Sequence, residues 1–239
     1  MTSPQAAFPV RLTGELDPEV GRWQWLFKWL LAIPHFIVLF FLWIGFVLST
    51  VVAGIAILFT GRYPRRIFDF NVGVLRWSWR VGFYSYSALG TDKYPPFSLG
   101  DDPDYPARLE VEYPERLSRG LVLVKWWLLA IPHYLLLGVF LGGGWYGGGG
   151  WDGDGDEWSG GGAPGLILLL VVFAAIALLF TTRYPRGIFA FVMGLDRWVL
   201  RVIAYAALMT DVYPPFRLDQ GGPEPADAAP ADREPVATT

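Results

Sequence analysis

The hydropathy pattern is dominated by a run from residue 23 to residue 61 in which Lys28 is the only charged side chain. One helix of that length would measure about 58 Å, whereas the hydrocarbon core of a bilayer is about 30 Å thick and needs about 20 residues. The pattern therefore predicts a hairpin of two membrane spans, at about residues 23–43 and 44–61. Two shorter apolar runs predict further spans at about residues 121–141 and 164–181.

Short motifs recur along the chain and indicate an internal repeat. LLAIPH at residues 30–35 returns at 128–133, an offset of 98, and RYPR at 62–65 returns at 183–186, an offset of 121. The difference, 121 − 98 = 23 residues, equals the length of the Gly-rich stretch 142–164. That stretch is predicted to be an insertion that lies outside the membrane, at the tip of the second hairpin.

The repeat divides the chain into two copies. We expect repeat 1 at residues 8–100 and repeat 2 at residues 105–218. Subtracting 98 from Leu141 places the turn of the first hairpin near residues 43–45. Residues 219–239 are rich in Pro, Ala and acidic side chains, a composition that predicts a disordered tail.

The segments after the two hairpins, at about residues 64–90 and 185–209, have a helical pattern with one polar face. In the first segment, this face is formed at spacings of three and four by Arg65, Asp69, Gly73, Arg76 and Arg80. Aromatic and aliphatic side chains occupy the other faces, which suits an amphipathic helix in the membrane interface. A spanning course is the alternative, but it would place Arg76 and Arg80 near the bilayer centre at about 2.5–3.5 kcal/mol each.

Residues 105–113 alternate between apolar and charged side chains, a pattern typical of a strand. Residues 8–15 and the two YPPF segments could add further strands. The predicted fold is an all-α integral membrane protein of two tandem repeats, each a transmembrane helical hairpin plus an amphipathic interfacial helix, with small cytoplasmic β elements.

Composition and charge agree with a membrane location. Of the 239 residues, 53% are hydrophobic, and the 17% that are charged fall below the quarter usual in soluble domains. Neither predicted hairpin tip contains Lys or Arg. By the positive-inside rule, the N-terminus, the central linker and the C-terminus should be cytoplasmic in a multi-pass protein of the bacterial inner membrane. The chain has no Cys, which excludes disulfides and thiolate metal sites.

The motifs LLAIPH, RYPR-x-IF and YPPF, with YPARLEVEYPERLSR at residues 105–119, support a family resemblance. The chain resembles the bacterial membrane family called domain of unknown function 4389, present in two tandem copies over residues 8–218. This resemblance implies a multi-span membrane protein. It implies no catalytic residues.

His35 and His133 are the only histidines and occupy matching places in the first span of each copy. Ionisable residues inside a span are candidates for function, so the two imidazoles could ligate one haem or metal ion or relay protons. The structural alternative, which we favour, is that Pro34 and Pro132 kink their helices and each His donates or accepts a hydrogen bond at the kink. We therefore expect no bound cofactor.

Nine arginines form the largest basic concentration and are predicted to lie near the cytoplasmic headgroups, where each could contact anionic lipid. They are Arg62, Arg65, Arg66, Arg76, Arg80, Arg183, Arg186, Arg197 and Arg201. The alternative is that they only set the topology. Asp152, Asp154 and Asp156 match half of a calcium-loop pattern, which is too little to predict a metal site.

No motif of an enzyme or of a nucleic-acid module is present in the sequence. We expect a non-enzymatic structural, lipid-interacting or accessory subunit, with membrane lipids, a membrane protein or further copies of itself as partners. The alternative is a small transporter or channel subunit that uses His35 and His133 and must oligomerise to enclose a path.

Overall fold

The computed structural model describes residues 8–18, 20–21, 23–142, 164–181, 183–216 and 218. The Gly-rich stretch after Gly142, with Asp152, Asp154 and Asp156, lies outside the described residues, as does the predicted tail at residues 219–239.

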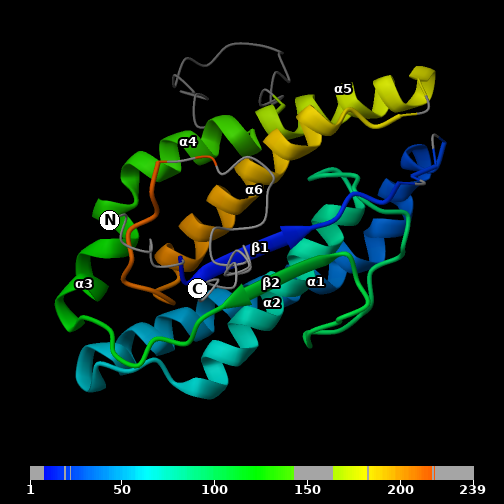
Figure 1. The fold of residues 1–239 in the computed structure, drawn as a ribbon. Coiled ribbons are helices and arrows are strands. Elements are labelled where there is room, and N and C mark those ends of the chain that lie inside the picture. The colour runs from blue at the N-terminus through cyan, green and yellow to red at the C-terminus, as the bar shows by residue number, and fades with distance from the viewer. Residues whose placement is uncertain are drawn as a thin grey trace, which may run out of the picture.

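The described chain is mostly helical, with two short strands (Figure 1). The elements in chain order are β1 Val10–Gly14, α1 Trp25–Thr60, α2 Arg65–Tyr84, β2 Ala107–Val111, α3 Arg119–Val124, the π-helix η1 Lys125–Leu129, α4 Ile131–Leu141, α5 Leu166–Thr181 and α6 Arg186–Ala206.

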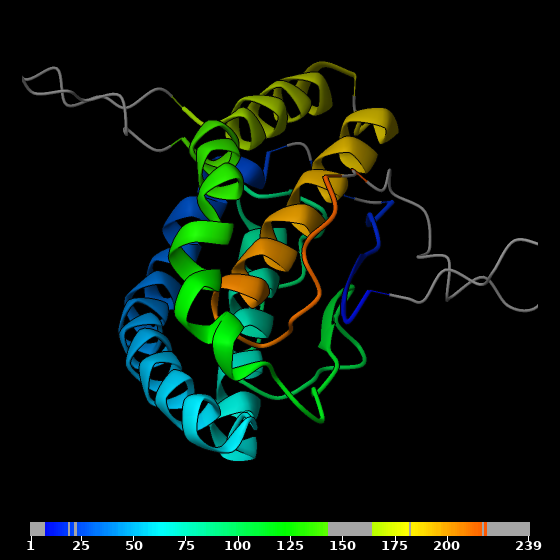
Figure 2. The ribbon, with the colours of Figure 1, turned by 90° about the vertical axis from the view of Figure 1, so that its left-hand side faces the viewer.

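The elements form three layers, seen edge-on in Figure 2. The outer apolar layer contains α1 together with α3, η1, α4 and α5, the middle layer contains α2 and α6, and the third layer is the sheet of β1 and β2. Large apolar side chains remain exposed along the apolar layer, including Phe40, Phe41, Phe59, Phe173 and Phe180. One face of the molecule is therefore apolar, and the face with the sheet lies opposite it.

The predicted hairpin turn near residues 43–45 is wrong, because α1 continues through it as one helix of 36 residues. Gly45 is the only helix-weakening residue there, and it allows close packing: a Cβ at this position would lie 3.3 Å from Cζ of Phe70. The helix ends at Gly61, whose φ of 71° places it in the left-handed region while its N–H donates to the Ile57 carbonyl at 2.7 Å. The prediction failed because the length of an apolar run does not by itself specify a turn, and no turn-forming sequence interrupts the helix near residue 44.

The second half of the chain has an interrupted version of the same helix. The bounds of α3–α4 and α5 agree with the predicted spans at 121–141 and 164–181, but these segments follow one another along the layer rather than folding back (Figure 1). Gly165 lies directly against the end of α4, since its Cβ position would be 2.3 Å from the Leu141 carbonyl carbon. The Gly-rich insertion thus leaves and re-enters the helix at one place.

The two long helical paths are antiparallel (Figure 1). The start of α3 lies beside the end of α1, where Leu117 N donates to the Gly61 carbonyl at 2.9 Å and Gly54 lies close to Val122. Farther along, Phe140 and Leu168 border the same groove as Phe36. The later residues of one path therefore lie beside the earlier residues of the other.

Helices α2 and α6 occupy the middle layer, which corrects their predicted place in the membrane interface. Most of their side chains are buried. The polar face of each helix contacts protein rather than headgroups, because Arg76 Nε donates to the Leu109 carbonyl and Arg197 Nε donates to the Leu12 carbonyl, both at 2.9 Å. The sequence pattern correctly indicates two amphipathic helices, but the polar face of each helix binds a strand rather than lipid headgroups.

The strand predictions for residues 105–113 and 8–15 are confirmed. Strands β1 and β2 pair antiparallel with Leu12 opposite Leu109 at the centre of the register. Strand β1 packs on α6 and β2 packs on α2, so each strand covers the helix of the other half. The YPPF segments do not join this sheet; they are irregular.

Matched contacts also join the halves near the RYPR motifs. The Tyr63 hydroxyl donates to the Ala207 carbonyl at 3.4 Å, and the Tyr184 hydroxyl donates to the Ala88 carbonyl at 2.8 Å. Each tyrosine therefore reaches from its own half into the other.

By length and composition, α1 is the one described helix able to cross a membrane alone. The path from Arg119 to Leu141 would be a second if its 45° bend is counted within one span. Helix α5 is apolar but shorter.

Candidate functional site

Lys28 is a buried ammonium group held by the TDKYPPF segment. Its Nζ lies 2.8 Å from Oδ1 of Asp92, donates to the Thr91 carbonyl at 2.7 Å, and lies 5.0 Å from the centroid of the Tyr84 ring. The other carboxylate oxygen of Asp92 accepts from the backbone N–H of Gly21. Asp92 thus ties the entry of α1 to the loop that follows α2.

Lys125 makes the same set of contacts in the second half. Its Nζ lies 2.9 Å from Oδ1 of Asp211, donates to the Thr210 carbonyl, and lies 4.9 Å from the Tyr205 ring centroid. Oδ2 of Asp211 accepts from the N–H of Ser118. We call these two arrangements the Lys28 latch and the Lys125 latch.

The π-helix η1 explains how the two latches can match. The first half has KWLLAIPH from Lys28 to His35, whereas the second has KWWLLAIPH from Lys125 to His133, one residue longer. A π-helical turn accommodates one extra residue within a helix, and η1 starts at Lys125. The extra Trp is thus absorbed locally, and both the lysine and the histidine stay on the buried face.

Each histidine is fully buried in an aromatic cage. The ring of His35 stacks on Phe97 at 3.9 Å between centroids, and its Nδ1 accepts from Trp77 Nε1 at 3.0 Å. The ring of His133 stacks on Phe216 at 4.5 Å, and Trp198 lies 5.2 Å away. Both YPPF segments therefore supply the stacking ring and hold the start of a long helix through its histidine.

The two imidazoles lie in separate cages with no shared ring neighbour. Because Nδ1 of His35 accepts a hydrogen bond, the proton of a neutral His35 ring is on Nε2. The described residues contain no cluster of three or more His, Asp or Glu side chains that could hold a metal ion. The separate cages do not bring the two imidazoles together for joint ligation of a haem or metal. The predicted hydrogen bonds at the proline kinks are not seen either: His35 bonds to the Trp77 side chain, and neither ring nitrogen of His133 has a partner among the described residues.

The nine predicted lipid-contact arginines fall into two groups. Arg76, Arg80, Arg197 and Arg201 face inward, where Arg80 donates to the Ser98 carbonyl and Arg201 lies 5.0 Å from the ring centroid of Phe8. The other five are exposed: Arg62, Arg65, Arg66, Arg183 and Arg186. Of the nine, only this group, near the ends of α1 and α5, is exposed at the surface.

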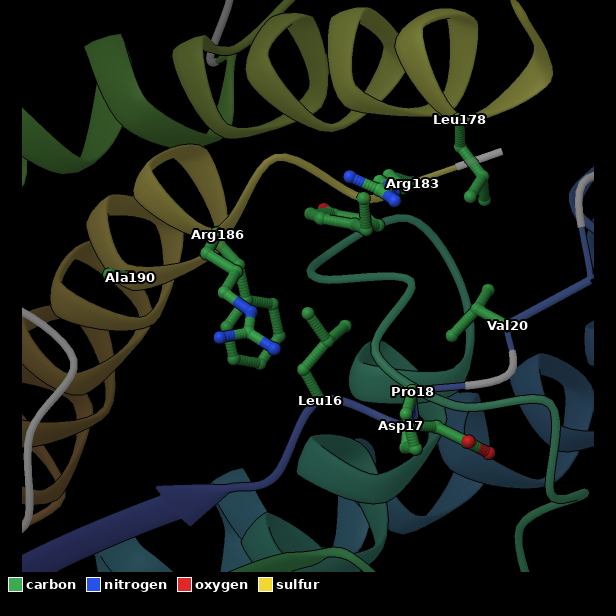
Figure 3. Close-up of a pocket in the computed structure, with 10 residues that line it drawn as sticks. Leu16, Asp17, Pro18, Val20, Leu178, Arg183, Arg186 and Ala190 are labelled. Atoms are coloured by element: carbon green, nitrogen blue, oxygen red, sulfur yellow. The ribbon is translucent and has the colours of Figure 1, made fainter. Parts of the chain in front are cut away.

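A basic pocket lies at each of these ends. The pocket of about 460 Å³ at the end of α1, which we call the Arg62 pocket, is lined by Thr60, Gly61, Arg62, Arg116, Leu117 and Arg119. The larger pocket of about 720 Å³ at the end of α5 contains Arg183 and Arg186 but also Asp17 (Figure 3). Figure 3 shows Asp17 beside Pro18, on the opposite side of this cavity from the two arginines.

Two apolar clefts lie between the antiparallel helical paths. The α6 cleft, about 570 Å³, lies between the second half of α1, α3–α4 and the end of α6, and its lining is almost wholly apolar. The α2 cleft, about 620 Å³, lies between the first half of α1, the α4–α5 junction and the end of α2, where Ser78, Ser85 and Ser87 add hydroxyl groups. Both clefts belong to the apolar layer.

The family model described as domain of unknown function DUF4389 matches residues 22–98 and 163–217. Together these segments cover more than half of the chain and are consistent with two copies. The chain belongs to the DUF4389 family. No curated protein and no solved structure shows significant similarity to it. The first DUF4389 segment contains Lys28, Asp92 and His35, and the second contains Asp211 and the cage residues Trp198 and Phe216.

Sequence reasoning missed both latches of this DUF4389 protein. The sequence pattern shows Lys28 only as an isolated charge, and the repeated YPPF motif alone does not point to Asp92 and Asp211, which precede it. The available signal was that each copy has one lysine seven or eight residues before its histidine and one aspartate before its YPPF. A lone charge inside an apolar run requires a buried partner, which makes those aspartates the natural candidates.

Proposed function

We propose that this protein is a non-enzymatic component of the bacterial cytoplasmic membrane that binds lipid through its apolar layer and acts as a structural or accessory subunit. The observation that carries the proposal is the continuous apolar surface of α1 and α3–α5, where Phe59 is 73% and Phe180 is 81% exposed. Soluble proteins rarely expose apolar patches larger than a few hundred Å². A bilayer is the natural solvent for this face.

The multi-pass topology predicted from the sequence needs revision within this proposal. Two spans in the first copy would require a turn near residues 43–45, but α1 is one continuous helix there. If α1 and the α3–α5 path crossed the bilayer, they would cross in opposite directions and place Arg62 and Arg183 on opposite sides, against the positive-inside rule. We favour a half-embedded protein whose apolar layer lies along the cytoplasmic leaflet, with the sheet and both termini in the cytoplasm.

The length of α1 supports this in-plane course. Thirty-six residues make a helix of about 54 Å, well beyond the thickness of about 30 Å that a straight span would fill. Lying flat, α1 buries one side against α2 and exposes its other sides to acyl chains. In this arrangement the exposed arginines at the end of α1 and at the end of α5 reach the headgroups on the same side of the membrane.

Several buried or partly buried ionisable groups have structural partners, which supports a non-enzymatic role. Lys28 and Lys125 are engaged in the latches, and Arg76 and Arg197 bind strand carbonyls. The transporter alternative relied on a pathway through paired histidines, and the separate cages of His35 and His133 give it no support.

Membrane fractionation followed by native mass spectrometry tests this proposal. We expect the full chain in the membrane fraction, resistant to alkaline carbonate and released by mild detergent with phospholipid or a partner protein attached. Recovery of the protein in the soluble fraction would overturn the proposal. Release as a bare chain would also contradict a lipid-binding or accessory role.

A further inference from the structure

The Arg62 pocket and the α6 cleft are adjacent parts of one surface. Leu58 and Val122 line the cleft, and Gly61 and Arg119 line the pocket, so each wall passes from apolar to basic within one helical turn. The hydrogen bond from Leu117 N to the Gly61 carbonyl joins these walls at the boundary. This surface therefore has a basic end followed by an apolar groove.

The basic end contains three arginines without an acidic partner among the described residues. Arg62, Arg116 and Arg119 are all exposed, and no ion pair formed within the described part of the chain involves any of them. Guanidinium groups bind phosphate with two parallel hydrogen bonds. Glu112 and Glu115 are close in sequence, but neither lines the pocket.

The groove has the chemistry of an acyl-chain site. Its lining includes Val47, Val51 and Leu58 from α1, with Leu137 and Ala206 on the other walls. Gly54 lets Leu208 pack closely against α1 in this lining, because a Cβ at that position would lie 3.2 Å from Cδ1 of Leu208. A volume of about 570 Å³ is within the range typical of ligand pockets.

We propose that this surface binds one anionic phospholipid, with the phosphate on Arg62, Arg116 and Arg119 and an acyl chain in the α6 cleft. This inference rests on the proposed membrane function and gives it a specific ligand. The opposite end of the molecule is a natural comparison: its basic pocket includes Asp17 (Figure 3), and its cleft includes serine hydroxyls. At the Arg62 end, by contrast, no described acidic residue lines the basic pocket, and the adjacent cleft is almost wholly apolar. These two features match the phosphate and the acyl chain of a phospholipid.

Lipid titration monitored by native mass spectrometry tests the site. The full chain in mild detergent is titrated with phosphatidylglycerol and, separately, with phosphatidylcholine. We expect phosphatidylglycerol to bind at least tenfold more tightly, and the variant R62Q/R116Q/R119Q to bind it roughly 100-fold more weakly. A charge-matched variant, R11Q/K93Q/R108Q, removes three cations from the sheet side and should bind like the unaltered protein.

The acyl-chain half is tested by filling the groove. Ala206→Phe should weaken binding of both lipids at least tenfold, whereas Val139→Phe, which introduces the same side chain on the lipid-facing side of α4, should not. Excess inorganic phosphate should leave phosphatidylglycerol bound. Displacement by phosphate would show a simple anion site and overturn the inference.

The outcomes separate this inference from the proposed function. Protein that stays in the carbonate-washed membrane but shows no preference for phosphatidylglycerol, or no loss in R62Q/R116Q/R119Q, overturns the lipid site alone. Protein recovered in the soluble fraction overturns the membrane proposal and the lipid site with it.

Discussion

At the scale of single residues, the buried charges have a positioning role. Lys28 and Lys125 each bring an ammonium group into an otherwise apolar helical face, where an unpaired charge would be costly. Each is paired with an aspartate from a distant segment, Asp92 or Asp211. Buried ion pairs add little net stability, but removal of one partner is strongly destabilising because the other charge stays behind. The latches therefore select one arrangement of loop and helix.

Asp92→Asn should destabilise the protein by about 3–5 kcal/mol, because the ammonium of Lys28 loses its counter-charge while remaining buried. The measurement is thermal unfolding in detergent. Asp101→Asn, at an exposed position in the following loop, serves as the control and should shift unfolding little. Equal melting temperatures for the two variants would contradict the role of the latch.

Asp196 should make stability fall as the pH rises. Burial raises the pKa of this carboxyl well above its usual value, so in the pH range above about 4 the native state retains a proton that the unfolded state has lost. By linkage, stability declines through that range up to the native pKa. Asp196→Asn should flatten the decline, measured as melting temperature from pH 5 to pH 8.

The matching position in the first half is Leu75, which is fully buried and apolar, so the helix does not require an ionised group there. An unchanged pH profile in Asp196→Asn would show that this carboxyl does not titrate differently between the two states. Asp102→Asn is a suitable control for general effects of charge.

At the scale of elements, the sequence was most informative where local pattern decides the structure. The strands around Leu12 and Leu109 and the start of the helix at Arg65 were predicted within two residues, although that helix ends at Tyr84 rather than near residue 90. The hairpin in α1 was not, since a long apolar run has the same pattern whether it crosses a bilayer twice or lies along it. The partner of the polar face of α2 could not be predicted either, because carbonyls of a distant strand leave no local signal.

Deletion of Trp126 should be tolerated. It makes the spacing from Lys125 to His133 equal to the spacing from Lys28 to His35, so η1 should become regular α-helix with the Lys125 latch and cage preserved. The control is deletion of Trp29, which lies in a stretch with no spare residue and would rotate His35 by about 100° relative to Lys28. Melting temperatures near that of the unaltered chain for the first variant, and loss of folding for the second, are expected.

At the scale of the whole molecule, layering separates an apolar face from a polar one. The chain has no cysteine, so single cysteines can report the side of the membrane directly. Glu115→Cys lies near the Arg62 end and Gly187→Cys near the Arg186 end, both at exposed positions. Since the in-plane arrangement places both ends at the cytoplasmic surface, a membrane-impermeant maleimide should label neither in intact cells and both in inverted vesicles. Labelling of only one of them in intact cells would show that the helices cross the bilayer.

The exchange of strands between halves has a consequence for assembly and ancestry. Strand β1 packs on α6, β2 packs on α2, and Tyr63 and Tyr184 each reach into the opposite half. In effect the molecule is a domain-swapped dimer whose subunits are joined by the linker after the first YPPF. Neither half should fold alone, yet residues 1–103 and 104–239 co-expressed as separate chains should assemble and co-purify. A relative with a single copy would be expected to reach the same structure by pairing with itself.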